Sequence, residues 1–299
     1  MMKLRKKILV FSLLFFLICM TIFMVFKDNV LIDCSKNWAL CSIDKQAINP
    51  IHNPKQIKIA IIDSGIDEQE ARVKVEKRFS PDRYTGDSFG HGTAVASIIA
   101  SEKSNKDNVE GLYPQAIIYD VNILDENGNA KMDEVISAIE WSIDQKVDII
   151  NMSFGIENDD SRLHDIVKKA VENKIIIVAS AGNTFGMYTE YPAKYEEVLS
   201  ISAVDEKMNL FKYAAKGKID FVAPGVDIEA VRIGWLSEQE RLSGTSFATA
   251  YATAIIAILL SEKKIDKDNY RDILIDYAEL PKGKLGNNSY GSGFLKFDD

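Results

Sequence analysis

From about residue 56 onward, the hydrophobic and polar positions follow two alternating patterns. Short apolar runs rich in β-branched residues and bounded by glycine or polar turns predict buried strands. Between them, apolar residues recur at helical spacing over 91–102, 132–145 and 160–173, and later helices are expected from Phe247 and over 268–279. The predicted strands are 57–62, 116–124, 147–153, 174–179, 198–204 and 219–223.

Strands that are apolar on both faces and alternate with helices predict a parallel sheet covered on both sides. We therefore expect one α/β domain over 56–299, with a doubly wound, mostly parallel sheet and helices on both faces. Ligands of such sheets bind beyond the carboxyl ends of the strands. The residues expected there are Asp63, Ser153-Phe154-Gly155 and Ala181-Gly182-Asn183.

The N-terminal segment departs from this pattern. Residues 8–26 form an uncharged, largely apolar stretch about one membrane thickness long, and four basic residues precede it. It lacks the small residues typical of a cleavage site. We predict a membrane anchor over 1–26 with the rest of the chain outside the cytoplasm, or a secreted protein if the segment is cleaved. Residues 27–55 have no sustained periodicity and predict a stalk.

Composition limits the classes of partner and of metal site. The net charge of −8 argues against a nucleic-acid partner, because such proteins need a basic face. The three cysteines include no CxxC pair, so a zinc ribbon or a thioredoxin-type site is not supported. Cys34 and Cys41 could close a small disulfide loop in an oxidising exterior or remain two thiols.

Ser246 is the first candidate for chemistry. It stands in Gly244-Thr245-Ser246, directly before an Ala-rich run that is apolar on every face and predicts a buried helix. A hydroxyl at a helix start lies beside unpaired N–H groups and the positive end of the helix dipole, which can stabilise an oxyanion. An ordinary serine N-cap has the same pattern, so a nucleophile requires partners elsewhere.

Among the three histidines, His91 is the candidate base. His52 lies in the predicted stalk, and His164 lies on the polar flank of an amphipathic helix. His91 begins a helix of small residues and has glycine on both sides, which allows backbone and substrate to approach closely. Asp63, at the end of a buried strand, could orient the imidazole, although Asp-Ser-Gly alone is more typical of an Asx turn.

Three motifs in the order Asp, His, Ser resemble the signatures of the subtilisin-like serine proteases. They are Asp63-Ser64-Gly65-Ile66-Asp67, Gly90-His91-Gly92-Thr93 and Gly244-Thr245-Ser246-Phe247-Ala248. The resemblance extends over 57–296. It implies that Ser246 attacks the peptide carbonyl, His91 transfers the proton, Asp63 holds His91 and the Asn183 amide stabilises the oxyanion. It also implies that catalysis requires no cofactor.

The resemblance further implies where a peptide or protein substrate binds. Gly128-Asn129-Ala130 and Ser153-Phe154-Gly155 correspond to two segments between which a substrate is held as an added β-strand. Glu190, just before Tyr191-Pro192, falls at the base of the pocket for the residue preceding the cut. A carboxylate there would favour Lys or Arg; alternatively, Glu190 is a solvated loop residue.

Two features depart from the family pattern. Residues 27–55 are too few for the long pro-domain of secreted subtilisins. Residues 103–109 have the length of the family's calcium loop and contain Asn105, Asp107 and Asn108, but the expected distant acid is missing from 68–71. A structural calcium site is therefore possible, but the sequence does not supply a full set of ligands. No residue is assigned to a metal.

We thus expect a membrane-anchored extracellular serine endopeptidase that matures a secreted peptide, such as a lantibiotic precursor, by cleaving after a basic residue. A broad-specificity secreted protease and a peptide-binding pseudoenzyme are the alternatives.

Overall fold

The computed structural model describes residues 34, 36–43, 55–81, 86–87, 89–104, 109–234, 241–284 and 288–297. All of them belong to one compact unit, Cys34–Asp299. The expected anchor over 8–26 lies outside the described residues. None of the helices within the described ranges is long and apolar enough to cross a membrane.

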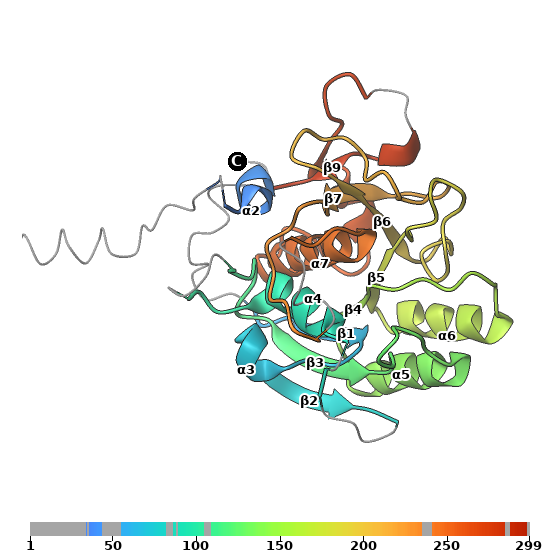
Figure 1. Cartoon of the computed structure of the whole chain (residues 1–299). Helices are drawn as coiled ribbons and strands as arrows, with labels where there is room; N and C mark the ends of the chain where they lie inside the picture. Colours follow the sequence, from blue (N-terminus) through green and yellow to red (C-terminus); the bar gives the residue numbers. More distant parts are fainter. Residues whose placement is uncertain are drawn as a thin grey trace, which may run out of the picture. The chain divides into compact units, whose positions relative to one another are not determined.

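The described strands form a nine-stranded sheet with the order β2-β3-β1-β4-β5-β6-β7-β9-β8 (Figure 1). Neighbouring strands are parallel except for the antiparallel pair of β8 and β9. The predicted parallel α/β fold is therefore confirmed. The strands are β1 (Lys58–Asp63), β2 (Val75–Phe79), β3 (Ile117–Asn122), β4 (Ile149–Met152), β5 (Ile176–Ser180), β6 (Leu199–Val204), β7 (Phe221–Pro224), β8 (Ala278–Glu279) and β9 (Phe294–Leu295).

Helices lie on both faces of the sheet. The pair α5 and α6 pack together on one face, and the pair α4 and α7 pack together on the other (Figure 1). The helices are α2 (Trp38–Ile43), α3 (Glu68–Ala71), α4 (His91–Ala100), α5 (Met132–Asp144), α6 (Ser161–Glu172), α7 (Thr245–Ser261) and α8 (Tyr270–Leu274), with a 3-10 turn, η2 (Asn288–Tyr290).

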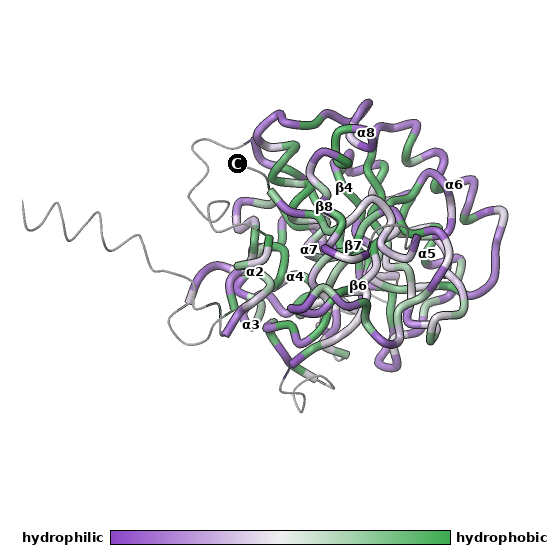
Figure 2. The backbone as a smooth tube through the Cα atoms, turned by 90° about the horizontal axis from the view of Figure 1, so that it is seen from above, coloured by the Kyte–Doolittle hydropathy of each residue, from purple (hydrophilic) through white to green (hydrophobic). Residues whose placement is uncertain are grey.

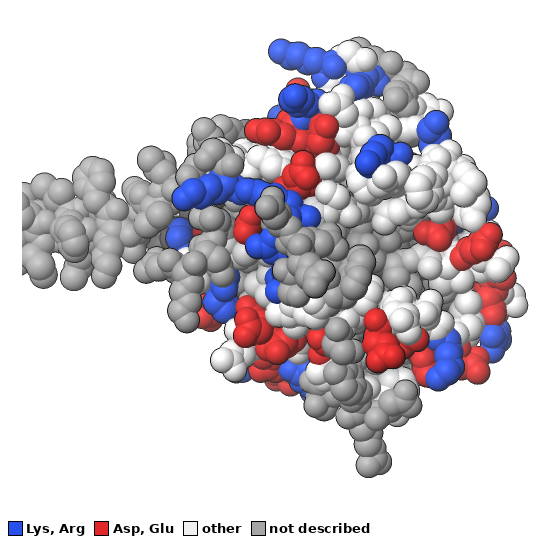
Figure 3. Space-filling model, in the orientation of Figure 1, with Lys and Arg blue, Asp and Glu red and all other residues white. Residues whose placement is uncertain are grey.

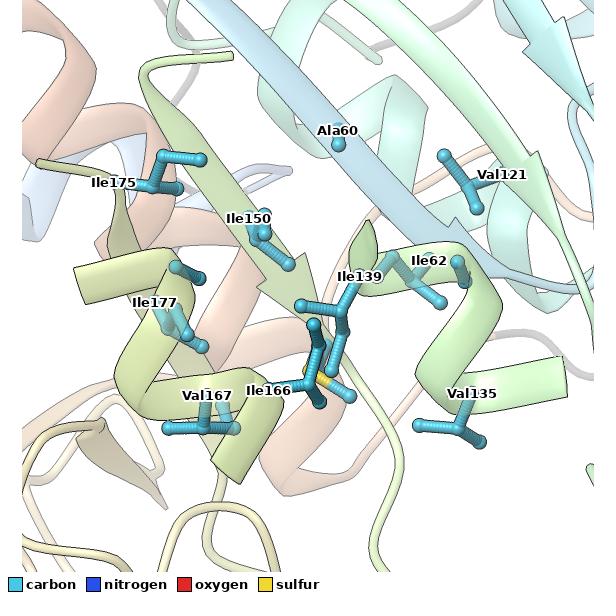
Figure 4. Packing of buried hydrophobic residues seen from close by; sticks show 14 of the residues in the cluster. Ala60, Ile62, Val121, Val135, Ile139, Ile150, Ile166, Val167, Ile175 and Ile177 are labelled. Atoms are coloured by element: carbon cyan, nitrogen blue, oxygen red, sulfur yellow. The ribbon is translucent and has the colours of Figure 1, made fainter. Parts of the chain in front are cut away.

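The alternation of side chains along each strand builds two apolar layers. Ala60 and Ile62 of β1 face α5 and α6, where they join a buried cluster that includes Ile139 and Val167 (Figure 4). The intervening strand residues face the α4 and α7 side, where the Asn151 amide of β4 donates to the hydroxyl of Thr253 in α7 at 2.9 Å. Figure 2 shows the hydrophobic segments gathered inside and the hydrophilic ones toward the periphery.

Helix α7 is enclosed on every side. Each of its residues except Ser246 is buried, and it packs against β4, β5, β6 and β7 as well as α4. An Ala-rich helix suits this position because small side chains let the sheet approach closely. The predicted buried helix is thus present, and it begins at Thr245.

Part of the segment expected to be a stalk is folded onto the domain. Cys34 and Cys41 form a disulfide around α2, and Trp38, Leu40 and Ile43 of this helix are buried. The backbone N–H of Phe297 donates to the carbonyl of Ile43 at 3.1 Å. A helix of six residues is too short to show periodicity, which is why the pattern did not predict it.

Candidate active site

The carboxyl end of β1 and the start of α4 bring Asp63 and His91 together. Nδ1 of His91 lies 2.8 Å from Oδ1 and 3.0 Å from Oδ2 of Asp63, and the Asp63 side chain is only 1% exposed. The close approach depends on Gly92, because a Cβ there would lie 2.2 Å from the carbonyl oxygen of Gly65. The two residues predicted to be base and orienting acid are therefore directly paired.

A second buried carboxylate, Asp87, is connected to this pair through Ser64. The Ser64 hydroxyl donates to Oδ1 of Asp87 at 2.8 Å, and the Ser64 N–H donates to Oδ1 of Asp63 at 2.8 Å. Asp87 also accepts hydrogen bonds from the start of α4, namely from Gly90 N, Thr93 N and Thr93 Oγ1. Sequence reasoning missed Asp87 because it lies three residues before the N-cap Gly90, outside the position at which a capping side chain is expected.

These charges determine the protonation of His91. Burial alone would lower the pKa of its imidazole, but the charge and hydrogen bond of Asp63 and the charge of Asp87 raise that pKa above its ordinary value. Burial also raises the pKa of Asp87, against the lowering effect of its hydrogen bonds with Thr93, Gly90 and Ser64. The two carboxylates therefore make the imidazole of His91 easier to protonate than that of a free histidine.

Ser246, the second residue of α7, directly precedes Phe247, whose ring lies near His91. The ring of Phe247 is 5.6 Å from the imidazole between centroids, and α4 packs against α7. The Ser246 hydroxyl donates to the backbone carbonyl of Ser153 at 2.7 Å, and the Ser153 hydroxyl donates to the Ser246 carbonyl at 3.2 Å. The end of β4 and the start of α7 are thereby joined beside the histidine.

Asn183 follows β5 and reaches the same helix start. Its Oδ1 accepts hydrogen bonds from the N–H and hydroxyl of Thr245 at 3.2 and 3.1 Å. A backbone N–H can only donate, so the amide atom that faces Thr245 is the oxygen Oδ1. The nitrogen Nδ2 therefore points away from Thr245. Nδ2 has no acceptor among the described residues, and a Cβ on Gly244 would lie 3.5 Å from it. A free donor thus lies beside the turn that precedes Ser246.

The Glu190 carboxylate fills the space between the segments after β4 and β5. A Cβ on Gly155 would lie 2.3 Å from Oε2 of Glu190, and a Cβ on Gly182 would lie 2.2 Å from it. Burial, followed by the charge of Glu157, raises the pKa of Glu190. No described Lys, Arg or His pairs with it. Glu190 is therefore a half-buried acid without a counter-ion, next to Gly182 and Asn183.

The other predicted substrate segment, 128–130, is connected to His91 through Phe89. Residues 125–129 form a turn in which the Asp125 N–H donates to the Asn129 carbonyl at 2.8 Å. A Cβ on Gly128 would lie 3.0 Å from the ring of Phe89, whose centroid is 6.0 Å from that of His91. Ala130 is half-buried against the α5 and α6 core, as is Phe154.

Asn183 also lines a cavity of about 740 Å³. Apolar side chains of Phe185, Phe211 and Tyr213 line it together with Val226 and Ser243. Phe185 is 71% exposed. Asp205, Lys212, Asp227 and Arg241 also line this cavity, so its lining is both polar and apolar.

The described residues contain no group of three or more His, Cys, Asp or Glu side chains arranged to hold a metal ion. Asn105, Asp107 and Asn108 of the segment with calcium-loop length lie outside the described residues.

A carboxylate-oriented histidine beside a helix-start serine, with an amide donor close by, defines the class of hydrolases that use a serine nucleophile. The sequence profile of the subtilase family (peptidase S8) matches residues 54–293. The chain belongs to the subtilase family.

Individual relatives agree with this assignment. The chain is 39% identical over 291 residues to the minor extracellular protease Epr of Bacillus subtilis, a match that covers 93% of the chain and 44% of Epr. It is 34% identical over 250 residues to subtilisin E of the same organism, with 80% of the chain and 64% of that protein covered. An intracellular serine protease of Paenibacillus polymyxa is 33% identical over 260 residues, covering 80% of the chain and 78% of that protein. The chain therefore spans less than two thirds of the length of Epr and of subtilisin E.

Proposed function

We propose that this chain is a serine endopeptidase in which Ser246 is the nucleophile, His91 the general base and Asp63 the group that orients His91. The observation that carries the proposal is the pairing of His91 Nδ1 with Asp63 at 2.8 Å beside the start of α7. Because Nδ1 donates to the carboxylate, Nε2 of the neutral imidazole is the acceptor that a hydroxyl needs.

The reaction starts with a rotation of the Ser246 side chain. Its hydroxyl leaves the Ser153 carbonyl, transfers its proton to Nε2 of His91 and attacks the peptide carbonyl. The developing oxyanion accepts hydrogen bonds from Nδ2–H of Asn183 and from the N–H of Ser246. Ser246 lies in the first turn of α7, where a backbone N–H has no intrahelical acceptor. His91 then protonates the leaving amine, and water hydrolyses the acyl-enzyme by the same steps in reverse order.

Labelling with a fluorophosphonate tests this function, because only an activated serine reacts with it. We expect stoichiometric labelling and casein hydrolysis by the wild type, and neither by Ser246→Ala. Binding of peptides without any labelling would instead support the pseudoenzyme, and hydrolysis that survives in purified Ser246→Ala would contradict the assignment of the nucleophile.

We further propose that Glu190 selects Lys or Arg before the cut. A half-buried carboxylate without a described counter-ion gains most from a substrate that supplies the cation. Glu190→Gln is expected to lower kcat/KM for a lysyl substrate by roughly tenfold or more while leaving that for a leucyl substrate nearly unchanged. Unchanged preference would contradict the proposal, and Glu157→Gln is the matched control with a smaller expected effect.

The pH dependence gives a second readout of the same pocket. Only the ionised carboxylate attracts a cation, and the pKa of Glu190 is raised by burial and by Glu157. As the pH falls, the lysyl preference should therefore disappear at a higher pH than an exposed glutamate would require. A ratio of lysyl to leucyl kcat/KM that does not depend on pH would count against Glu190.

The narrower biological role is also a proposal. Residues 8–26 would anchor the enzyme in the membrane with the domain outside the cell, and a counter-ion-free acidic pocket favours processing of one class of peptide, such as a lantibiotic precursor. A broad-specificity secreted protease is the alternative, since the names of the relatives above are those of general proteases and mention no leader or precursor peptide. Comparing kcat/KM for a leader-bearing peptide with that for unfolded casein distinguishes the two roles.

A further inference from the structure

The segment that follows β7 pairs with the segment that immediately precedes Ser246. Ile228 and Leu242 exchange two backbone hydrogen bonds of 2.8 and 3.0 Å, and the N–H of Gly244 donates to the carbonyl of Gly225 at 2.8 Å. The Asp227 N–H also donates to the Ser243 hydroxyl at 3.0 Å. The backbone that presents Ser246 is thus continuous with this pair, which we call the nucleophile ladder (225–228 and 241–244).

The disulfide-closed segment Cys34–Cys41, which contains most of α2, contacts both strands of the nucleophile ladder. The indole N–H of Trp38 donates to the carbonyl of Val226 at 3.1 Å. From the second strand, the Arg241 guanidinium donates to the carbonyl of Lys36 at 2.7 Å, and it also pairs with Glu229 at 3.4 Å. Val226, Arg241 and Ser243 line the cavity that includes Asn183. Helix α2 therefore supports one wall of the site from outside.

The disulfide explains how so short a helix can serve as a support. An isolated helix of six residues has little stability in water. Here the Cys34–Cys41 disulfide closes a loop that contains the first turn of α2. The buried side chains of Leu40 and Ile43 pack α2 against the domain. Trp38 is itself only 9% exposed, so its N–H has a fixed direction toward Val226.

We propose that α2 and its disulfide are a positioning element for the reaction, with Trp38 as the positioning residue that acts through the nucleophile ladder on Ser246. This inference rests on the proposed serine endopeptidase function. Loss of the Trp38 contact lets the ladder shift relative to Asn183 and His91, so that the attack on the carbonyl slows although the substrate still binds.

The test compares Trp38→Phe with the wild type. The variant keeps an aromatic ring in the buried position and loses the N–H donor. Active-site titration with a fluorophosphonate counts the competent enzyme, so kcat is expressed per titrated serine. We expect kcat for a small peptide anilide to fall by about three- to tenfold, the equivalent of one net hydrogen bond, with KM changed less than twofold.

A second variant and a control separate positioning from stability. Cys34→Ser/Cys41→Ser should lower kcat per titrated serine in the same direction, and Ser42→Ala should not. Ser42 donates only within α2, to the Ala39 carbonyl at 2.9 Å. Unchanged kcat per titrated serine in Trp38→Phe would overturn the inference even if its Tm falls, because stability alone changes the number of active molecules. A wild type that neither titrates nor hydrolyses would overturn the proposed function instead.

Discussion

Single residues around His91 determine over which pH range the proposed base can act. Asp63 contacts the imidazole directly, whereas Asp87 acts across Ser64 and the first turn of α4. Burial opposes the charge on His91, and the two carboxylates raise the pKa of the imidazole. Because a general base must be neutral, a raised pKa moves the acid limb of activity toward higher pH.

Replacement of Asp87 by Asn should move that limb. Without the charge of Asp87, the pKa of His91 falls, more of the imidazole is neutral at a given pH, and the acid limb of kcat/KM shifts to lower pH. A pH profile of Asp87→Asn measures the shift, and Glu172→Gln on the exposed end of α6 is the control. An acid limb that stays where it is in the wild type would show that Asp87 supports only the fold of α4.

Asn183→Ala tests the proposed oxyanion donor. Its Nδ2 has no described acceptor, so the group is available to an oxyanion that forms only during attack. We expect kcat to fall by about 10²–10³-fold, a magnitude established on subtilisin itself, with little change in KM. Met187→Ala, at a nearby residue that is 63% exposed, serves as the control. A small change in kcat would mean that the N–H of Ser246 suffices.

The sequence predicted these residues unevenly. The order of three motifs identified Asp63, His91 and Ser246, and the structure places Asp63 against His91 beside the helix that carries Ser246. The sequence did not predict the hydrogen bond from the Ser246 hydroxyl to the Ser153 carbonyl. The rotamer of Ser246 depends on atoms that are distant in sequence. The surroundings of Glu190 were equally hidden, since they depend on two glycines of other loops.

Among the elements, α7 combines two roles. It carries Ser246 at its start, and its remaining turns form the centre of one apolar layer of the domain. Its stability is therefore linked to the geometry of the site. The Asn151–Thr253 hydrogen bond adds a polar contact that fixes how α7 lies against β4.

Leu259→Ala tests the structural role of α7. Leu259 is completely buried, so the shorter side chain leaves a cavity and should lower the free energy of unfolding by about 2–5 kcal/mol. Urea unfolding followed by circular dichroism measures the change. Lys168→Ala on the exposed side of α6 should change it by less than about 0.5 kcal/mol. A loss that small in Leu259→Ala would contradict the dense packing described for α7.

Elements with a clear period were predicted within a few residues, for example α5, expected over 132–145 and observed over Met132–Asp144. β2 was missed because its sequence VEKRF is half-exposed or exposed throughout and has no apolar run. The helix expected over 268–279 ends at Leu274, and residues 278–279 pair with β9 instead. There, tertiary pairing outweighed local helical preference.

On the scale of the whole molecule, the net charge does not explain which peptides the proposed enzyme would select. The chain carries a net charge of −8, and on the face in Figure 3 acidic and basic side chains are interspersed. General attraction of basic peptides is therefore weak compared with one buried carboxylate such as Glu190. Composition gives only the net charge of the chain. The structure is needed to show that the Glu190 carboxylate lies next to Asn183 without a described counter-ion.

The order of the candidate residues along the chain has a consequence for its synthesis. Asp63 ends β1, whereas Ser246 lies in the first turn of α7, and β2 to β7 lie between them along the sequence. A ribosome adds residues from the N-terminus, so every nascent chain shorter than about residue 246 lacks the proposed nucleophile. The proposed active site can therefore form only after α7 has been synthesised and has packed against the sheet and α4.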